Sequence, residues 1–130
     1  MEEEFFYRLR KQDKIICQMR RRGDQVFFSK DGFWWRGDEQ LNAQVKKGLF
    51  LVDDYTGIRD KNNRFLFAED IVQFRLGSII KRKRAFQIVK VGEEFQVRPL
   101  FPGPQLTIEE IAQKPDLEWI SYTFLNADFG

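Results

Sequence analysis

The chain has 130 residues, of which 42% are hydrophobic, 15% aromatic and 32% charged, so it can bury a core and is not generally disordered. It contains no histidine and one cysteine, Cys17, which excludes an intrachain disulfide and a thiolate or imidazole metal site. The net charge is +2, but residues 92–130 carry 2 basic and 7 acidic residues, so a basic body precedes an acidic segment that suits either an anionic partner or self-complementary assembly.

The first 31 residues predict strands, either as an arm or as part of the main fold. Residues 4–19 read as one or two strands around a polar turn at residues 11–13. The acidic start, MEEEFF, is unlike a secretory signal, and the longest apolar runs are far too short to span a membrane. We therefore expect a cytoplasmic protein that has no membrane partner.

A hairpin and a short helix are predicted next. Two aromatic runs in QVFFSKDGFWWRGD flank residues 29–32, where Asp-Gly supplies the positive φ of a tight turn. Asp38 is placed to cap a helix over residues 39–47, which Gly48 would end.

The remainder of the chain is dominated by strand signals. Residues 49–55 read as a strand, residues 60–63 as a turn, and residues 70–76 alternate between apolar and polar side chains. Two strands are expected around a turn at residues 91–94, followed by a proline-rich stretch that ends the sheet. Thr107 and Glu110 form a capping-box pattern, and residues 117–125 read as a closing strand or docked segment. The pattern predicts a mainly β fold, a small barrel or partly open sheet with one or two short helices.

The stretch YTGIRDKNNRFLFAEDIVQF resembles the signature of the YopX-like proteins of phages and prophages. In that family Tyr-Thr-Gly is followed by a hydrophobic residue, Lys or Arg, Asp-Lys-Asn-Gly, a spacer and Glu-Gly-Asp-Ile-Val. The glycine of Asp-Lys-Asn-Gly corresponds to Asn63, and the Glu-Gly pair to Ala68 and Glu69. The residues identified as the structural motif are Tyr55, Thr56, Gly57, Asp60, Asn62 and Asp70.

Two flanking segments extend the resemblance over residues 32–118. Gly32, Trp34 and Gly37 are similar to an upstream Gly-x-Trp-x-x-Gly element, and IAQKPDLEW is similar to the closing segment of the family. The resemblance implies one domain over residues 1–130 that contains an SH3-like barrel, encoded by a mobile element of a bacterium. The resemblance does not indicate any particular activity, because the family has no established biochemical function.

Catalytic chemistry has little support in the sequence. Asp53, Asp54, Asp60, Glu69 and Asp70 could gather around Mg²⁺, but turn capping is the interpretation favoured for Asp60 and Asp70. Cys17 has no histidine to activate it and lies in a stretch that reads as core. No catalytic residue, metal ligand or cofactor is therefore predicted.

Basic clusters are the strongest functional hint. Lys and Arg side chains neutralise phosphates and aromatic side chains stack on bases, so a nucleic-acid site is a hypothesis. The same clusters could instead blunt a sheet edge or contact an acidic protein, and the aromatic runs could be core or a subunit interface. We therefore expect a self-associating, non-enzymatic binding protein with a host protein or nucleic acid as partner, the alternative being a nucleic-acid-binding module. Its candidate residues are Arg20, Arg21, Arg22, Trp34, Lys81, Arg82, Lys83 and Arg84.

Overall fold

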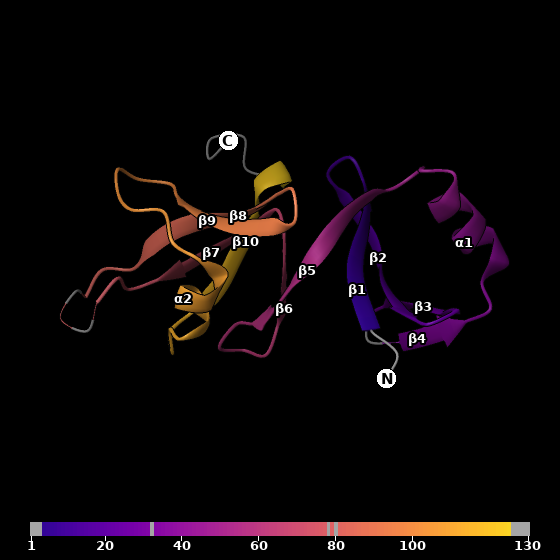
Figure 1. The fold of residues 1–130 in the computed structure, drawn as a ribbon, viewed down its shortest axis with the longest axis horizontal. Coiled ribbons are helices and arrows are strands. Elements are labelled where there is room, and N and C mark those ends of the chain that lie inside the picture. The colour runs from indigo at the N-terminus through magenta and orange to yellow at the C-terminus, as the bar shows by residue number, and fades with distance from the viewer. Residues whose placement is uncertain (1–3, 32, 78, 80, 126–130) are drawn as a thin grey trace. The chain divides into compact units, whose positions relative to one another are not determined.

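The computed structural model describes residues 4–31, 33–77, 79 and 81–125, and it is mainly β (Figure 1). Its strands form two antiparallel sheets, accompanied by two short α-helices and one turn of 3₁₀ helix, η1. The elements are β1 (Glu4–Lys11), β2 (Lys14–Arg22), β3 (Gln25–Lys30), β4 (Phe33–Arg36), α1 (Glu39–Lys46), β5 (Leu51–Arg59), β6 (Phe65–Phe67), β7 (Asp70–Phe74), β8 (Arg84–Val91), β9 (Glu94–Pro99), α2 (Ile108–Ala112), β10 (Glu118–Tyr122) and η1 (Thr123–Leu125).

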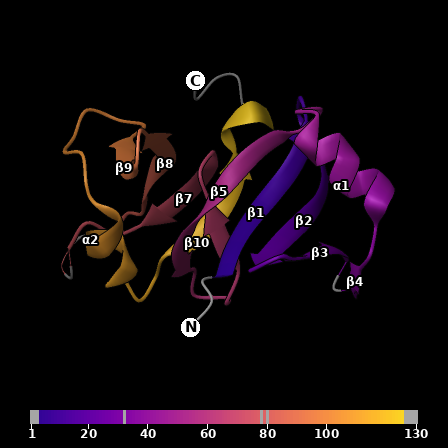
Figure 2. The same ribbon diagram turned by 45° about the vertical axis from the view of Figure 1, so that its right-hand side comes forward.

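The chain divides into two compact units, Met1–Tyr55 and Thr56–Gly130. In the first unit the strands lie in the order β4-β3-β2-β1-β5, with each neighbouring pair antiparallel. One face of this sheet is apolar, and Figure 2 shows α1 on the first unit. The core between sheet and helix is built from Leu9, Cys17, Met19, Phe28 and Phe50, with Leu41 and Val45 of α1 packed against it.

The second unit contains the end of β5, β6 and a four-stranded sheet in the order β10-β7-β8-β9. Alternation in β7 buries Val72 and Phe74, and Phe74 stacks on Phe86 of β8 at a ring distance of 4.6 Å. Helix α2 adds Ile108 and Ile111 to the same core. The predicted alternation is therefore confirmed for Val72, Gln73 and Phe74, whereas Asp70 and Ile71 are both buried and do not follow it.

The structure has the predicted hairpin turn and both predicted helix caps. Asp31 has a φ of 54° at the β3–β4 turn, while Gly32 lies outside the described residues. Asp38 caps α1 by accepting a hydrogen bond from the backbone N–H of Leu41 at 2.9 Å. Thr107 caps α2 in the same way through Glu110 at 3.1 Å. Short-range capping chemistry thus determines where both helices begin.

Neither sheet closes into a barrel in the part of the chain that the structure describes. Over the described ranges, both sheets are open, with β4 and β6 at the ends of one and β10 and β9 at the ends of the other. The SH3-like barrel accordingly stays a prediction, as does the single domain. The boundary between the compact units falls at Tyr55, inside β5.

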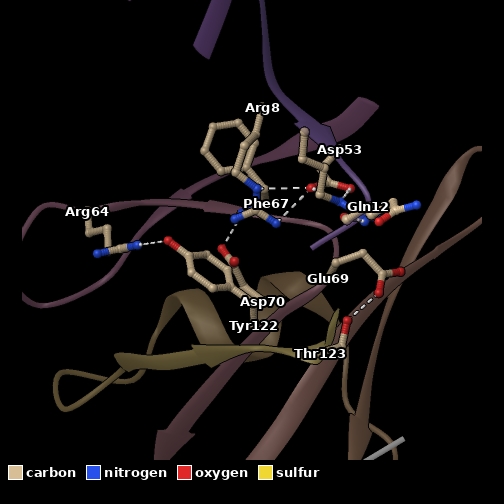
Figure 3. A network of polar contacts seen from close by, with 10 residues as sticks. Arg8, Gln12, Asp53, Arg64, Phe67, Glu69, Asp70, Tyr122 and Thr123 are labelled. Atoms are coloured by element: carbon tan, nitrogen blue, oxygen red, sulfur yellow. Dashed lines mark hydrogen bonds and ion pairs between the residues drawn. The ribbon is translucent and has the colours of Figure 1, made fainter. Parts of the chain in front are cut away.

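Two of the non-glycine residues that have positive φ stand where the family pattern has glycine. Asn63 has a φ of 66° and Glu69 a φ of 76°. Asparagine tolerates this region, but for glutamate the Cβ makes it unfavourable. Glu69 is held in place by its N–H, which donates to the carbonyl of Ile88 at 2.7 Å, and by its carbonyl, which accepts from the N–H of Thr123 at 2.9 Å. Its side chain also accepts from the Thr123 hydroxyl (Figure 3).

Glu69→Gly is expected to unfold at a higher urea concentration than Glu69→Ala, with a difference in free energy of unfolding of about 1 kcal/mol. Both variants lose the side-chain bond to Thr123, so the comparison isolates the backbone strain at this position. Equal stability of the two variants would contradict the assignment of strain to Glu69.

Candidate nucleic-acid interface

The β7–β8 loop presents exposed cations at one end of the second unit's sheet. Figure 1 shows the described parts of this connection continuing beyond the ends of β7 and β8. Lys81, Arg82 and Lys83 are exposed, and β8 begins at Arg84. Ile79 in the same loop is 92% exposed. The loop therefore combines positive charge with an apolar side chain in water.

Glu118 of β10 gathers two lysines at this end. Its carboxylate lies 3.2 Å from Lys61 Nζ and 3.7 Å from Lys83 Nζ. Gln73 Nε2 also donates to it at 2.6 Å. The hydrogen bond from Gln73, followed by that from Lys61, lowers the pKa of Glu118 below its usual value. Glu118 therefore stays charged at neutral pH and brings Lys61 and Lys83 together.

Asp116 organises a second part of the same end. Its carboxylate accepts from the backbone N–H of Arg75 at 2.9 Å and from Arg75 Nε at 3.2 Å. Burial opposes ionisation of Asp116, but these bonds outweigh it and lower the pKa of the group. Lys114 Nζ lies nearby, donating to the carbonyl of Leu76 at 3.0 Å.

We use the name basic end for the surface that these contacts define. Two carboxylates, Asp116 and Glu118, compensate part of its charge. In the described part of the chain no ion pair joins Lys81, Arg82 or Arg84 to a carboxylate. Arg84 instead lies over the ring of Phe101, 4.1 Å from its centroid. The basic end consists of Lys61, Arg75, Lys81, Arg82, Lys83, Arg84 and Lys114.

The other predicted basic run, Arg20 to Arg22, lies in the first unit, and two of its arginines already form ion pairs with a carboxylate. Arg20 Nη2 lies 2.6 Å from Glu4, and Arg22 Nε lies 3.5 Å from the same carboxylate. The hydrogen bond from Arg20 lowers the pKa of Glu4. The Arg20 guanidinium also lies between Phe6 and Phe27, 5.6 and 6.0 Å from their centroids. A phosphate at Arg20 or Arg22 would compete with these contacts.

Arg21 and Trp34 complete the set predicted in the first unit. Arg21 is exposed and paired in register with Phe5 and Val26, so it faces away from Arg20. Trp34 lies on the edge strand β4 and is 46% exposed. Arg20 to Arg22 and Trp34 belong to the first unit, whereas Lys81 to Arg84 belong to the second. The basic end thus contains half of the predicted residues.

Three residues of the basic end were not predicted from the sequence, namely Lys61, Arg75 and Lys114. Each is separated from Lys81 to Arg84 in the chain, and the carboxylates that bind Lys61 and Arg75 lie in β10 and in the turn before it. Single basic residues in strands and turns carry no local signal, so only the fold brings them together.

The residues of the predicted structural motif stabilise the turns that connect β5, β6 and β7. Thr56 Oγ1 donates to the carbonyl of Leu66 at 2.7 Å, and Asp70 Oδ2 accepts from the backbone N–H of Phe67 at 2.8 Å. Gly57 has a φ of 89°, and the Tyr55 ring meets Phe6 edge-on at 5.7 Å. The backbone N–H of Asn62 donates to Asp60 at 2.9 Å. These contacts fold the β5–β6–β7 region and leave little of the motif for a ligand.

Metal and nucleophilic chemistry find little support in the side chains that can be described. Among them no group of three or more Cys, Asp or Glu residues could hold a metal ion. Cys17 is buried in the first core, where loss of solvation, with a contribution from Asp38, raises the pKa of the thiol to about 11. No helix within the described ranges is both long and apolar enough to cross a membrane.

Cys17 is expected to react with a thiol reagent about 100-fold more slowly in the native protein than in urea at neutral pH, because its thiolate fraction falls by that factor. The folded thiol keeps its proton while the unfolded thiol ionises near its usual 9.0, so stability falls as pH rises from 9.0 to about 11. Cys17→Ala should lose this component of the pH dependence. Rapid native labelling would contradict the burial.

Comparison with protein-family models, curated proteins and solved structures gave no match for this chain.

Proposed function

We propose that this chain is a non-enzymatic binding protein whose basic end contacts the phosphate backbone of a nucleic acid. The observation that carries the proposal is the exposed run Lys81, Arg82 and Lys83 on the projecting β7–β8 loop. Among the described residues Lys81 and Arg82 have no carboxylate partner, whereas Lys83 lies 3.7 Å from Glu118. Lysine and arginine side chains that neutralise phosphates release the counterions condensed on the nucleic acid, which favours binding. An acidic protein is a less favoured ligand, because the loop offers a linear series of charges rather than a shaped apolar site.

The surroundings of the loop support the same ligand. The Arg84 guanidinium lies 4.1 Å from the centroid of the Phe101 ring, and Phe101 itself makes edge contact with Phe86 at 5.2 Å, so the guanidinium rests against an anchored ring. A guanidinium fixed in this way can bind a phosphate through two of its N–H groups or stack on a base. The exposed Ile79 offers an apolar contact of the kind that side chains make with unstacked bases.

We also propose, from the resemblance, that the chain is a divergent YopX-like protein of phage or prophage origin, with an SH3-like barrel, that works in the bacterial cytoplasm. The two positions at which the family pattern has glycine support this alignment. Asn63 and Glu69 both have positive φ, which is the backbone that glycine adopts most easily.

The test of nucleic-acid binding uses two double variants that remove the same charge. Lys81→Gln/Arg82→Gln is expected to weaken binding of a fluorescent single-stranded DNA about 10-fold at low salt. Lys46→Gln/Lys47→Gln, at the exposed end of α1, should change it less than about 2-fold. Fluorescence anisotropy measures both affinities. Equal weakening by the two variants would mean that net charge alone attracts the DNA and would contradict a site at the basic end.

A second candidate function, self-association, is favoured by the edge strand β4. Phe33 on this strand is 77% exposed and Trp34 is 46% exposed. Exposed aromatic side chains on an unpaired sheet edge are a template for pairing with another strand. We propose that the chain forms a homo-oligomer through this edge.

A further inference from the structure

Strand β4 is the end of the first unit's sheet. It pairs with β3 on one side, from Phe27↔Arg36 to Lys30↔Phe33, and no strand lies on its other side in the described part of the chain. Figure 2 shows β4 outermost beyond β3. The chain turns away directly after Arg36, at Gly37, whose φ is 79°. A partner can therefore pair with four residues, Phe33 to Arg36.

The side chains of β4 alternate between the two faces of the sheet. Trp35 packs on Phe28 at a ring distance of 6.2 Å and donates from Nε1 to Asp38 at 3.1 Å, so it faces the core. Trp34 and Arg36 point to the opposite face, two residues apart. Arg36 is exposed. The strand thus carries one aromatic and one cationic side chain in adjacent positions on its solvent-facing side.

This arrangement is self-complementary under a two-fold axis. When two identical strands pair antiparallel about an axis perpendicular to the sheet, residues of the same face lie opposite each other. Within β4 the strand can then be centred on Trp34 or on Trp35. Centring on Trp35 places Trp34 opposite the partner's Arg36 and Arg36 opposite the partner's Trp34. Centring on Trp34 pairs Trp34 with itself and carries Arg36 beyond the partner strand.

We infer that a second copy of this chain pairs antiparallel with β4, with Trp35 at the two-fold axis. Cross-strand neighbours lie about 5 Å apart, so each Trp34 ring meets a guanidinium, and the cation–π contact forms twice. Like-charged arginines avoid each other in this register. The pairing continues the sheet of the first unit from one protomer into the next. The inference rests on the self-association proposed above and is independent of nucleic-acid binding.

The register is tested by exchanging the two side chains. Trp34→Arg sets arginine against arginine twice and is expected to abolish dimer formation over a low-micromolar to submillimolar range. Trp34→Arg/Arg36→Trp restores an aromatic–cation pair on both sides and should restore the dimer. Phe33→Ser is the control for non-specific hydrophobic association through the exposed aromatic side chains of β4. It should weaken association less than Trp34→Arg. Sedimentation velocity gives the association constants, and far-UV circular dichroism verifies that each variant is folded.

The outcomes separate the register from self-association itself. A wild-type protein that stays monomeric throughout overturns both. A wild-type dimer that survives Trp34→Arg overturns pairing at β4 and leaves self-association standing. A folded exchange variant that stays monomeric overturns the register. If the exchange variant does not fold, Trp34→Arg mixed with Trp34→Glu/Arg36→Glu must form a heterodimer, and failure to do so overturns the pairing.

Discussion

Asp53→Ala is expected to lower the free energy of unfolding of the first unit by about 3 to 5 kcal/mol. Asp53 of β5 lies across from Arg8 of β1, and Figure 3 shows the two side chains meeting. The Oδ2 atom of Asp53 is 2.9 Å from Arg8 Nε and 3.0 Å from Arg10 Nε. Arg8 and Asp53 are both about 3% exposed, so water cannot replace the carboxylate. The large effect follows because two guanidinium groups would lose the acceptor that they share.

Urea denaturation followed by tryptophan fluorescence measures this loss. Asp24→Ala is the matched control, because Asp24 is exposed in the β2–β3 turn, and it should change stability by less than about 0.5 kcal/mol. Replacing both partners, as in Arg8→Met/Asp53→Leu, should recover part of the loss, since an apolar pair leaves fewer charges buried. A single Asp53→Ala variant as stable as wild type would show that the ion pair contributes nothing to the sheet.

Asp60→Ala is expected to cost the second unit about 3 to 5 kcal/mol, because three backbone N–H groups lose their acceptor together. Asp60 Oδ1 accepts from Asn62 and Arg64 at 2.9 Å each, and Oδ2 accepts from Trp119 at 3.0 Å. The first two bonds shape the β5–β6 turn, and the third ties that turn to β10. The carboxyl group is buried, so solvent does not take over these bonds.

Asp60→Asn separates the two roles of this carboxylate. An amide oxygen can keep the bonds to Asn62 and Arg64, whereas an amide N–H facing the Trp119 N–H cannot accept. The expected cost is about 1 to 3 kcal/mol, smaller than that of the alanine variant. Glu93→Ala, in the exposed β8–β9 turn, is the control. Equal costs for Asp60→Ala and Asp60→Asn in urea denaturation would contradict a turn held mainly through Oδ1.

Short-range signals in the sequence predicted the local elements well, because each depends on a few neighbouring residues. The β3–β4 hairpin, the Asp38 cap of α1 and the Thr107 capping box are all of this kind. The order of the strands could not be predicted in the same way. Pairing of β1 with β5 brings Arg8 to Asp53 over 45 positions, and pairing of β10 with β7 follows a similarly long connection. Hydrophobic alternation says which face is buried, not which strand is the neighbour.

The candidate site shows the same limit. The run Lys81 to Arg84 could be identified from composition alone, and the structure has it in and beside an exposed loop. The carboxylates that compensate basic residues lie far away in the chain, Glu118 for Lys83 and Glu4 for Arg20. Composition therefore could not distinguish Arg20, which is already paired, from Lys81 and Arg82, which have no carboxylate partner among the residues that the structure describes.

The most direct measurement is the salt dependence of binding between the wild-type protein and a short single-stranded DNA of mixed sequence. If Lys81 to Arg84 all contact phosphates, the logarithm of the association constant should fall with the logarithm of salt concentration with a slope of about −3. In Lys81→Gln/Arg82→Gln the slope should become shallower, at about −1.5. Absence of binding at low salt, or a slope near zero, would contradict the assignment of the basic end to nucleic acid.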